Sequence, residues 1–443
     1  MARLRPEVAG EGPAETRLQP NGDGGGGGGK SGWRTRAGLW HCDDSMKSAA
    51  ASVRPSARPA NALLLGLATL VAACGGGGGD SSPTQHPLDD TLRLHQVQVL
   101  GSHNSYHRLP RPALFQALAE IVPPLATAWE YEHLPLGEQF ETQGIRQIEL
   151  DVWADPDGNR FSRRPVLGFV GDDPESGIPE LDEPGFKVLH VHELDFESTC
   201  WTFVSCLENV RDWSLAHPGH VPLFILVEAK DDATPDLLQL GFGTPVPIGP
   251  AEFDALDAEI RSVFDEGHVV TPDEVRADFP TLAAAIEERG WPTLGELRGR
   301  VIFALDNGGQ KKADYIAGHP SLEGRILFTS SEPPEPEAAF VKLNDPIGDG
   351  PKIRDLVQRG FVVRTRTDGD TEQARSGDTT DRDAALASGA QFVSTDYPVP
   401  NPDFGTGYFV EIPGGTPARC NPLTAPTECT STDVEDPALL GGN

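Results

Sequence analysis

Basic residues are scarce in this chain of 443 residues, which has 36 Lys and Arg against 67 Asp and Glu and a formal net charge of −31 at pH 7. A nucleic-acid-binding protein neutralises phosphates with clustered Lys and Arg, so this composition argues against a nucleic-acid partner. It also argues against unaided docking on anionic lipid, for which a metal ion or a covalent anchor would have to supply the attraction. We interpret most of the carboxylates as surface groups that keep the protein soluble.

Several motifs are missing as well. The six cysteines include no CxxC pair, which argues against a thiolate zinc site. No glycine-rich phosphate loop of the GxGxxG or GxxxxGK type follows the first strand-like run, so a nucleotide-binding fold loses support. No pleckstrin-like, EF-hand-like or C2-like segment is present, and nothing indicates a signalling architecture.

The cysteines that are present include two local pairs. Cys200 and Cys206 frame the segment CWTFVSC, and Cys420 and Cys429 lie near the C-terminus. Each pair could close a small loop in an oxidising compartment.

The N-terminal region predicts export. Residues 1–45 show no hydrophobic period, and we interpret them as disordered or untranslated, with Met46 as the better start. Residues 46–73 combine basic residues, a short apolar run and small residues before a cysteine, which is typical of an export signal. The alternative, a membrane helix, is disfavoured because about 14 apolar residues fall short of the ~20 that a span needs.

The end of this signal predicts a lipid anchor. The segment Val71-Ala72-Ala73-Cys74 resembles a bacterial lipobox, in which the cysteine is acylated, and we favour this reading over simple secretion. Gly75, rather than Asp, favours the outer membrane or cell surface. The Gly-rich residues 74–94 predict a flexible tether.

From residue 95 onward, short β-branched runs alternate with helical patterns. We predict strands at 97–104, 146–153, 187–192, 223–230, 300–307, 325–330, 361–368 and 391–398. Helical patterns occupy 136–144, 203–218, 251–267, 353–360 and 378–390. This alternation predicts an α/β fold, a (β/α)₈ TIM-type barrel that is irregular and lacks a helix or two. A doubly wound open sheet is the alternative.

The barrel is expected to span 95–398, with long loops at its catalytic mouth. The connections 105–135 and 154–186 are the two long ones, and loops of this length are usually functional. The Pro- and Gly-rich extension 399–443 is expected to wrap the outside, held by a bridge between the two C-terminal cysteines.

Polar residues gather where the predicted strands end. Residues two apart on a strand share a face, and TIM-barrel active sites lie at the carboxyl ends of the strands. The first four strands end in His103 and Asn104, Glu149 and Asp151, His190 and His192, and Glu228 and Lys230. Later strands add Asp306, Arg364, Arg366, Asp368 and Asp396. A single histidine in a hydrophobic core would not indicate a function. Four consecutive strands that all end in polar or charged residues predict an active site.

The residue types indicate the chemistry. The oxygen donors, which suit Ca²⁺ first and Mg²⁺ second, are Asn104, Glu149, Asp151 and Glu228. Two histidines beside such a site suit phosphoryl transfer, one stabilising charge and one protonating the leaving group. Lys230 and Arg364 are the candidate phosphate ligands.

The motifs GSHNSYH, RQIELDVW, KVLHVHELDF and LFILVEAK together resemble the PLC-like phosphodiesterase superfamily, and above all the bacterial Ca²⁺-dependent phosphatidylinositol-specific phospholipases C. The likeness runs from about residue 95 to 398. It implies a phosphoric diester hydrolase that cleaves phosphatidylinositol-type phospholipids to diacylglycerol and inositol (cyclic) phosphate.

By this resemblance, His103 stabilises the phosphoryl transition state and His190 protonates the diacylglycerol oxygen. The four oxygen donors bind Ca²⁺, which lowers the pKa of the attacking inositol 2-hydroxyl. The general base stays open, with Glu149 as one candidate. The HVHEL segment departs from the His-Gly pattern of eukaryotic relatives.

Two other functions stay open. A glycerophosphodiester phosphodiesterase usually carries His-Arg-Gly and a Pro-Glu-Asn-Thr-like segment, and HNSYH has neither. The second alternative is a non-catalytic surface lipoprotein that binds lipids or sugars. The presence of both histidines and all four oxygen donors argues against this alternative. We expect a monomer attached to the membrane through Cys74.

Overall fold

The computed structural model describes residues 86–415 and 417–440. The predicted segment 1–45, the predicted signal 46–73 and most of the predicted tether lie outside the described residues. Within the described part, no helix is long and apolar enough to cross a membrane.

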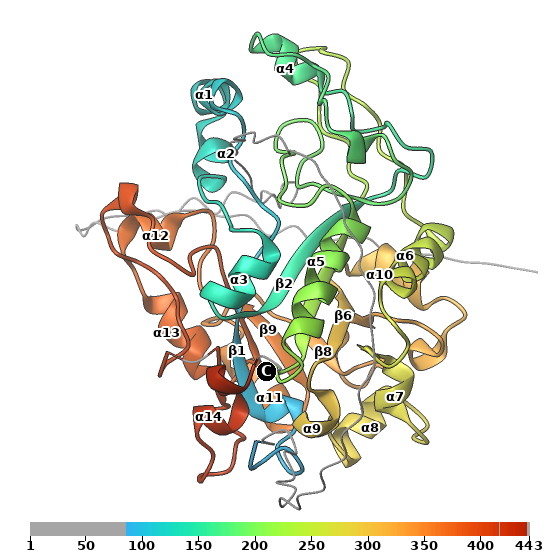
Figure 1. Cartoon of the computed structure of the whole chain (residues 1–443), viewed down its shortest axis with the longest axis vertical. Coiled ribbons are helices and arrows are strands. Elements are labelled where there is room, and N and C mark those ends of the chain that lie inside the picture. The colour runs from blue at the N-terminus through green and yellow to red at the C-terminus, as the bar shows by residue number, and fades with distance from the viewer. Residues whose placement is uncertain (1–85, 416, 441–443) are drawn as a thin grey trace, which may run out of the picture. The chain divides into compact units, whose positions relative to one another are not determined.

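Strands and helices alternate along most of the chain (Figure 1). The strands are β1 (Val97–Ser102), β2 (Ile145–Trp153), β3 (Lys187–Val188), β4 (Leu223–Lys230), β5 (Val269–Val270), β6 (Val301–Leu305), β7 (Phe328–Thr329), β8 (Phe340–Lys342), β9 (Val362–Arg366), β10 (Phe392–Thr395) and β11 (Ala418–Cys420). The helices are α1 (Pro112–Ile121), α2 (Pro123–Ala128), α3 (Leu136–Thr142), α4 (Pro165–Phe169), α5 (Phe203–Ala216), α6 (Pro250–Val263), α7 (Pro272–Arg276), α8 (Leu282–Glu288), α9 (Leu294–Leu297), α10 (Gly309–Ile316), α11 (Gly350–Gln358), α12 (Glu372–Ser376), α13 (Thr380–Ala387) and α14 (Ser431–Val434).

Parallel strands close into a ring in the order β1, β2, β4, β6, β7, β8, β9 and β10. β1 pairs with both β2 and β10, so the first and last strands of the ring are neighbours. β7 pairs with β6, and a single parallel bridge between Ser330 and Phe340 continues the pairing to β8. The predicted TIM-type barrel is therefore confirmed, and the open doubly wound sheet is excluded.

One predicted barrel strand is wrong. The run 187–192 forms only the short β3, which pairs antiparallel with the end of β2 and stands outside the ring. β1 ends at Ser102, and its pairing with β2 stops at Gln147. The later part of this edge of β2 does not pair with β1, and Val188 of β3 pairs there with Val152. The ring strand that the sequence did not predict is β8.

The predicted helical patterns become α3, α5, α6, α11 and α13. α5 begins where the Thr202 hydroxyl accepts a hydrogen bond from the Ser205 backbone N–H at 3.0 Å, a capping arrangement that satisfies an otherwise unpaired donor. The predicted irregularity is also present, because no helix separates β7 from β8. Pro333, Pro334 and Pro336 occupy that connection and cannot donate backbone hydrogen bonds.

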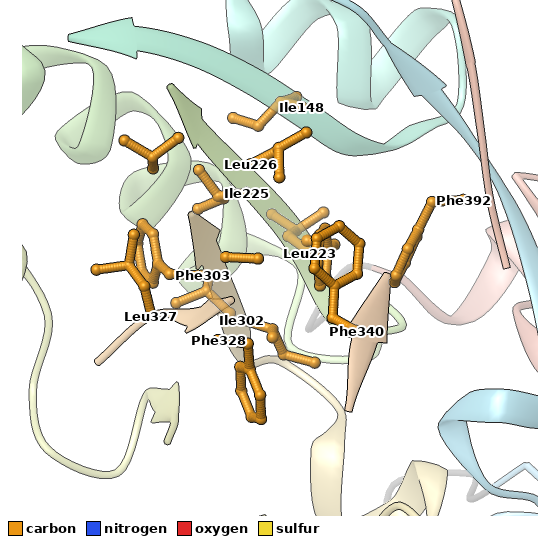
Figure 2. Close-up of a cluster of buried hydrophobic side chains, with 14 of the residues drawn as sticks. Ile148, Leu223, Ile225, Leu226, Ile302, Phe303, Leu327, Phe328, Phe340 and Phe392 are labelled. Atoms are coloured by element: carbon orange, nitrogen blue, oxygen red, sulfur yellow. The ribbon is translucent and has the colours of Figure 1, made fainter. Parts of the chain in front are cut away.

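Aromatic rings fill the barrel near the amino ends of the strands. Phe224 of β4 stacks on Phe392 of β10 with ring centroids 4.0 Å apart, and it contacts Phe340 of β8 at 5.0 Å. These three strands do not pair with one another, so the contacts cross the interior of the barrel. Figure 2 labels Phe340 and Phe392 in this buried cluster. The three rings therefore identify the inward face of each strand.

Toward the carboxyl ends, this inward face becomes charged. The register pairs Gln147 with Phe224 and Arg364 with Phe392, so these residues share the inward face. Residues two and four positions further along point the same way. On or just after the strands, the charged inward residues are Glu149, Asp151, Glu228, Lys230, Asp306, Lys342, Arg364, Arg366 and Asp396.

The two long connections build a second hydrophobic cluster beyond the barrel core. The connection 105–135 folds into α1 and α2, and 154–186 contains α4. Leu118 and Leu167 are buried together in this cluster, separately from the main core. Figure 1 shows α1, α2 and α4 at the end of the barrel to which β2 points.

The C-terminal segment is attached to the barrel. β11 pairs antiparallel with β1, and disulfides join Cys420 to Cys429 and, elsewhere, Cys200 to Cys206. Further on, Glu435 accepts hydrogen bonds from the buried Arg146 Nε at 2.9 and 3.1 Å and from a backbone N–H at 2.8 Å.

We predict that Arg146→Met destabilises the protein by about 3 kcal/mol, because it leaves the buried Glu435 carboxylate without its partner. Burial alone would raise the pKa of Glu435, but the charge and hydrogen bonds of Arg146, together with the Val221 backbone hydrogen bond and His220, lower it. The pair therefore stabilises the fold at neutral pH, and this contribution is lost as the pH falls below about 4. Urea unfolding at several pH values measures both effects.

The matched control is Arg211→Met, which removes an exposed guanidinium from α5 and should change stability little. Equal losses in the two variants would contradict the buried attachment of the C-terminal segment.

Candidate active site

Three of the predicted metal ligands converge at the carboxyl ends of neighbouring strands. Glu149 and Asp151 come from β2 and Glu228 from β4, and each offers a carboxylate oxygen within 4.8 Å of the others. The strand register places Asp151 opposite Glu228. Oxygen donors gathered in this way fit Ca²⁺, and the described residues place no cysteine among them.

The charge of this carboxylate group favours a cation. Burial raises the pKa of Asp151 well above its usual range; Lys230 opposes the shift, and Glu228 and Glu149 add to it. Burial also raises the pKa of Glu149, against the opposing charge of Arg364. Buried carboxylates that repel one another are stabilised by positive charge, so the group suits a divalent ion.

The predicted phosphate ligands lie at the site but contact these carboxylates. The Lys230 ammonium lies 3.1 Å from Asp151 Oδ2 and 2.8 Å from Glu228 Oε2. The Arg364 guanidinium donates a hydrogen bond to Glu149 Oε2. Both cations therefore hold predicted metal ligands in place in this structure.

The fourth predicted ligand, Asn104, follows β1 in a tight turn. Its φ of 36° falls in the left-handed region, which Asn adopts more readily than most residues. The next residue ties the turn to β2, because the Ser105 N–H donates to the Glu149 carbonyl and the Ser105 hydroxyl accepts from the Glu149 N–H, both at 2.9 Å. The turn thereby brings Asn104 to the strand that carries Glu149.

His103 is held in one tautomer by its neighbours. Its Nδ1 lies 2.8 Å from Asp396 Oδ1, and its Nε2 lies 2.9 Å from Arg366 Nη1 and 3.9 Å from Glu149 Oε1. A guanidinium only donates, so Nε2 carries the lone pair and Nδ1 donates to Asp396. Burial lowers the pKa of His103 well below its usual range, and the charge of Arg366 adds to this, so the imidazole is neutral.

His190 lies just after β3 and pairs with Asp195. Its Nδ1 is 2.7 Å from Asp195 Oδ2, and His107 Nε2 lies 3.5 Å from the same oxygen. Burial lowers the pKa of His190, helped by Lys230, and burial raises the pKa of Asp195. Both shifts favour the uncharged forms of the two side chains.

The two predicted catalytic histidines belong to one site. Tyr131 connects them, because its hydroxyl lies 3.4 Å from His103 Nδ1 and its ring stacks on His107. The His107 ring lies in turn 6.2 Å, centroid to centroid, from the ring of His190.

His192, in contrast, lies outside this group. Its Nε2 accepts a hydrogen bond from the Thr234 N–H at 3.3 Å, and its ring packs on Trp153 with centroids 4.8 Å apart.

The site contains residues to which the sequence patterns assigned no role. Asp195 lies in the motif HVHELDF, five residues after His190, and this spacing was the only signal for it. His107 lies in HNSYH and stacks on Tyr131 with ring centroids 4.6 Å apart. Tyr131 also reaches His103 Nδ1 at 3.4 Å, and it comes from a long connection that carried no signal.

A second group of side chains has the spacing of a metal site. His107, His190 and Asp195 offer ligand atoms within 4.8 Å of one another. Two imidazoles and one carboxylate suit a transition metal better than Ca²⁺, which prefers oxygen donors. The carboxylate group on β2 and β4 is therefore the one that fits Ca²⁺.

Comparison with known proteins supplies the family. The sequence model of the family described as phosphoinositide phospholipase C, Ca²⁺-dependent, matches residues 92–422. Among solved structures, a calcium-dependent phosphoinositol-specific phospholipase C from Pseudomonas sp. is 16% identical with a TM-score of 0.45, covering 77% of this chain and 99% of that chain. A Ca²⁺-dependent phosphatidylinositol-specific phospholipase C from Streptomyces antibioticus is 18% identical with a TM-score of 0.42, covering 71% and 97%.

A mutant of the phosphatidylinositol-specific phospholipase C from Staphylococcus aureus is 13% identical with a TM-score of 0.39, covering 76% of this chain and 95% of that one. No curated protein matches. The family match spans well over half of the chain and includes every predicted site residue. The chain belongs to the family of Ca²⁺-dependent phosphoinositide phospholipases C.

Proposed function

We propose that this protein is a Ca²⁺-dependent phosphodiesterase that cleaves phosphatidylinositol-type phospholipids to diacylglycerol and inositol phosphate, with a cyclic phosphate as first product. The observation that carries the proposal is the grouping of Glu149, Asp151 and Glu228, with a neutral His103 beside Glu149. Lys230, which contacts this group, is near enough to His190 for its charge to lower that pKa. Acidic ligands flanked by two imidazoles suit in-line attack on one phosphorus.

The metal ligands in this proposal are Asn104, Glu149, Asp151 and Glu228. Ca²⁺ held by them would supply the positive charge that lowers the pKa of the inositol 2-hydroxyl and offsets charge on the phosphoryl oxygens. Mg²⁺ is the second candidate, because it demands stricter octahedral geometry.

His103 is suited to take the proton of the attacking hydroxyl. Its Nδ1–H is anchored on Asp396, and its Nε2, which lies 3.9 Å from Glu149 Oε1, can take a proton once Arg366, which donates to it in this structure, turns to a phosphate oxygen. Once protonated, the imidazolium would be stabilised by Asp396 and would place positive charge beside the phosphorus. His103 then supplies the transition-state stabilisation that the family resemblance implies, and also the general base, which the resemblance left open.

His190 is suited to protonate the diacylglycerol oxygen. Asp195 Oδ2 lies 2.7 Å from His190 Nδ1 and would orient the ring for proton transfer from its other nitrogen. Arg366 donates toward His103 Nε2 and is partly exposed, so its guanidinium is available to a phosphate oxygen.

The proposal also includes the location. An acyl group on Cys74 and the tether 74–94 would hold a monomeric enzyme on the outer membrane or cell surface, where it meets phospholipid. This part rests on the lipobox-like segment alone.

The purified protein is expected to release an inositol phosphate from phosphatidylinositol vesicles, to lose this activity in EDTA and to regain it with Ca²⁺. Phosphorus NMR of the soluble products measures the reaction and separates cyclic from acyclic phosphate. If the protein hydrolyses glycerophosphodiesters but not phosphatidylinositol, the proposed function is wrong and the protein is a glycerophosphodiester phosphodiesterase. Turnover of neither would favour a binding lipoprotein.

His103→Ala and His190→Ala should each lower kcat roughly 10²- to 10⁴-fold, because each removes a proton-transfer group. His217→Ala, at the end of α5 next to the amino ends of the strands, is the control and should leave kcat unchanged. Circular dichroism verifies that all three variants fold. A near-normal rate in either active-site variant would refute the role assigned to that histidine.

Lys230→Met should bind Ca²⁺ at least about tenfold more tightly than the wild type in isothermal titration calorimetry. The Lys230 ammonium neutralises Asp151 and Glu228, so an arriving cation must compete with it. Lys311→Met removes a lysine paired with Asp231 outside the carboxylate group and should leave the affinity unchanged. Unchanged or weaker binding in Lys230→Met would show that Lys230 does not compete with the ion.

A further inference from the structure

His107, His190 and Asp195 form a compact buried group that the proposed mechanism uses only in part. Each side chain offers a ligand atom within 4.8 Å of the others. His190 Nδ1 and His107 Nε2 face the same atom, Asp195 Oδ2, at 2.7 and 3.5 Å. The proposed function assigns roles to His190 and Asp195 but none to His107. We call these three residues the His–His–Asp group.

The backbone already holds the His–His–Asp group together. His190 and Asp195 flank a tight turn, in which the Val191 N–H donates to the Asp195 carbonyl at 2.7 Å and the Asp195 N–H donates to the Val191 carbonyl at 2.9 Å. His107 pairs with Ser198 in an antiparallel bridge, which joins the segment after β1 to the segment after this turn. The three side chains are therefore preorganised for a common ligand.

The Asp195 carboxylate lacks a fixed cation. Its Oδ1 is buried and accepts no hydrogen bond from any residue that the structure describes. Among these residues, its ion-pair partners are the two histidines, and no Lys or Arg reaches it. Burial raises the pKa of Asp195 well above its usual range, and the negative charge of Glu197 adds to this shift. A positive ion at Asp195 would offset both influences.

The two imidazoles determine which ion fits. Burial lowers the pKa of both His107 and His190, so each ring is uncharged near pH 7 and can offer a lone pair. Ca²⁺ prefers oxygen donors, whereas Zn²⁺ binds imidazole nitrogen and carboxylate oxygen together. Two histidines and one carboxylate, with water in the fourth position, are an established ligand set for Zn²⁺.

The distances within the group are close to those of a zinc site. Tetrahedral ligand bonds of about 2.1 Å separate the ligand atoms from one another by roughly 3.4 Å. The 3.5 Å between His107 Nε2 and Asp195 Oδ2 matches this separation, and the 2.7 Å between His190 Nδ1 and Asp195 Oδ2 has to widen. A small rotation of the Asp195 side chain is sufficient for this.

An ion at His190 Nδ1 would interfere with proton transfer. A neutral ring with the metal on Nδ1 carries one proton, on Nε2. If that proton moved to the diacylglycerol oxygen, the ring would become an imidazolate anion, whereas transfer from an imidazolium leaves a neutral ring. The metal-bound ring is therefore a poor general acid.

We propose that His107, His190 and Asp195 bind Zn²⁺ and that the bound ion inhibits the enzyme by occupying Nδ1 of its general acid. This site is separate from the carboxylate group on β2 and β4 that fits Ca²⁺. The inference rests on the proposed function for the inhibition, but not for the binding of the ion.

Crystals of the full-length protein soaked in ZnCl₂ with Ca²⁺ present test the binding directly. Anomalous difference maps collected above and below the zinc absorption edge locate the ion without reference to turnover. We expect a strong zinc peak bounded by His107, His190 and Asp195. The absence of a peak there, or a zinc peak at Glu149, Asp151 and Glu228 alone, would overturn the inference.

Hydrolysis of a water-soluble inositol phosphodiester tests the inhibition. The protein is incubated with ZnCl₂ before substrate is added, because the three ligands are buried. The rate in saturating Ca²⁺ should fall at least about tenfold, and the zinc concentration for half-inhibition should not change when Ca²⁺ is raised further. Relief of the inhibition by Ca²⁺ would show that zinc acts at the carboxylate group and would overturn the proposed mechanism of inhibition.

His107→Phe keeps a ring against Tyr131 and removes the ligand nitrogen. Relative to its own zinc-free rate, it should need at least about tenfold more zinc for half-inhibition than the parent, and it should lose the zinc peak. The matched control is His192→Asn, which replaces a buried histidine of the same HVHEL segment that lies outside the group. It should keep the zinc sensitivity of the parent.

Equal zinc sensitivity of His107→Phe and the parent, or an equal loss of sensitivity in His192→Asn, would contradict the inference. Circular dichroism verifies folding, and His107→Asn is the second variant if His107→Phe does not fold. If the parent hydrolyses no phosphodiester but shows the zinc peak at His107, His190 and Asp195, the proposed function fails and the zinc site stands.

Discussion

Paired charge at the carboxyl end of the barrel is the constraint on which the rest of this structure depends. Asp151 and Glu149 are removed from water, at a cost that only opposite charge can offset, and Lys230 and Arg364 supply that charge. The parallel register makes the arrangement possible, because inward positions on neighbouring strands meet at the same level. A group of carboxylates balanced by a lysine ammonium is well suited to exchange that ammonium for a divalent ion.

The barrel separates stability from chemistry along its axis. At the amino end, Phe224, Phe340 and Phe392 pack across the interior, and the C-terminal segment is tied to the outside. At the carboxyl end, charged side chains take the same inward positions, and the two long connections build the second hydrophobic cluster, whose Trp129 packs against His190.

Much of this organisation could be predicted from strand ends alone. Period-2 patterns place Glu149 and Asp151 on one face, and parallel strands bring that face to Glu228, as the structure has it. The run KVLHVH was wrongly predicted as a barrel strand, because a β-branched run does not show whether a neighbouring strand has a free edge for it to pair with. β8 was missed because it has only three residues and follows a proline-rich segment, so it forms no recognisable pattern. The hydrogen bonds that fix the tautomer of His103 cross long stretches of sequence and leave no local signal.

Anomalous diffraction from crystals soaked in Ca²⁺ tests the central claim most directly, because it locates the ion without reference to turnover. The account predicts one strong peak bounded by Asn104, Glu149, Asp151 and Glu228, with the Lys230 ammonium moved away from the carboxylates. A peak at the group formed by His107, His190 and Asp195, or none at the ends of β2 and β4, would contradict it.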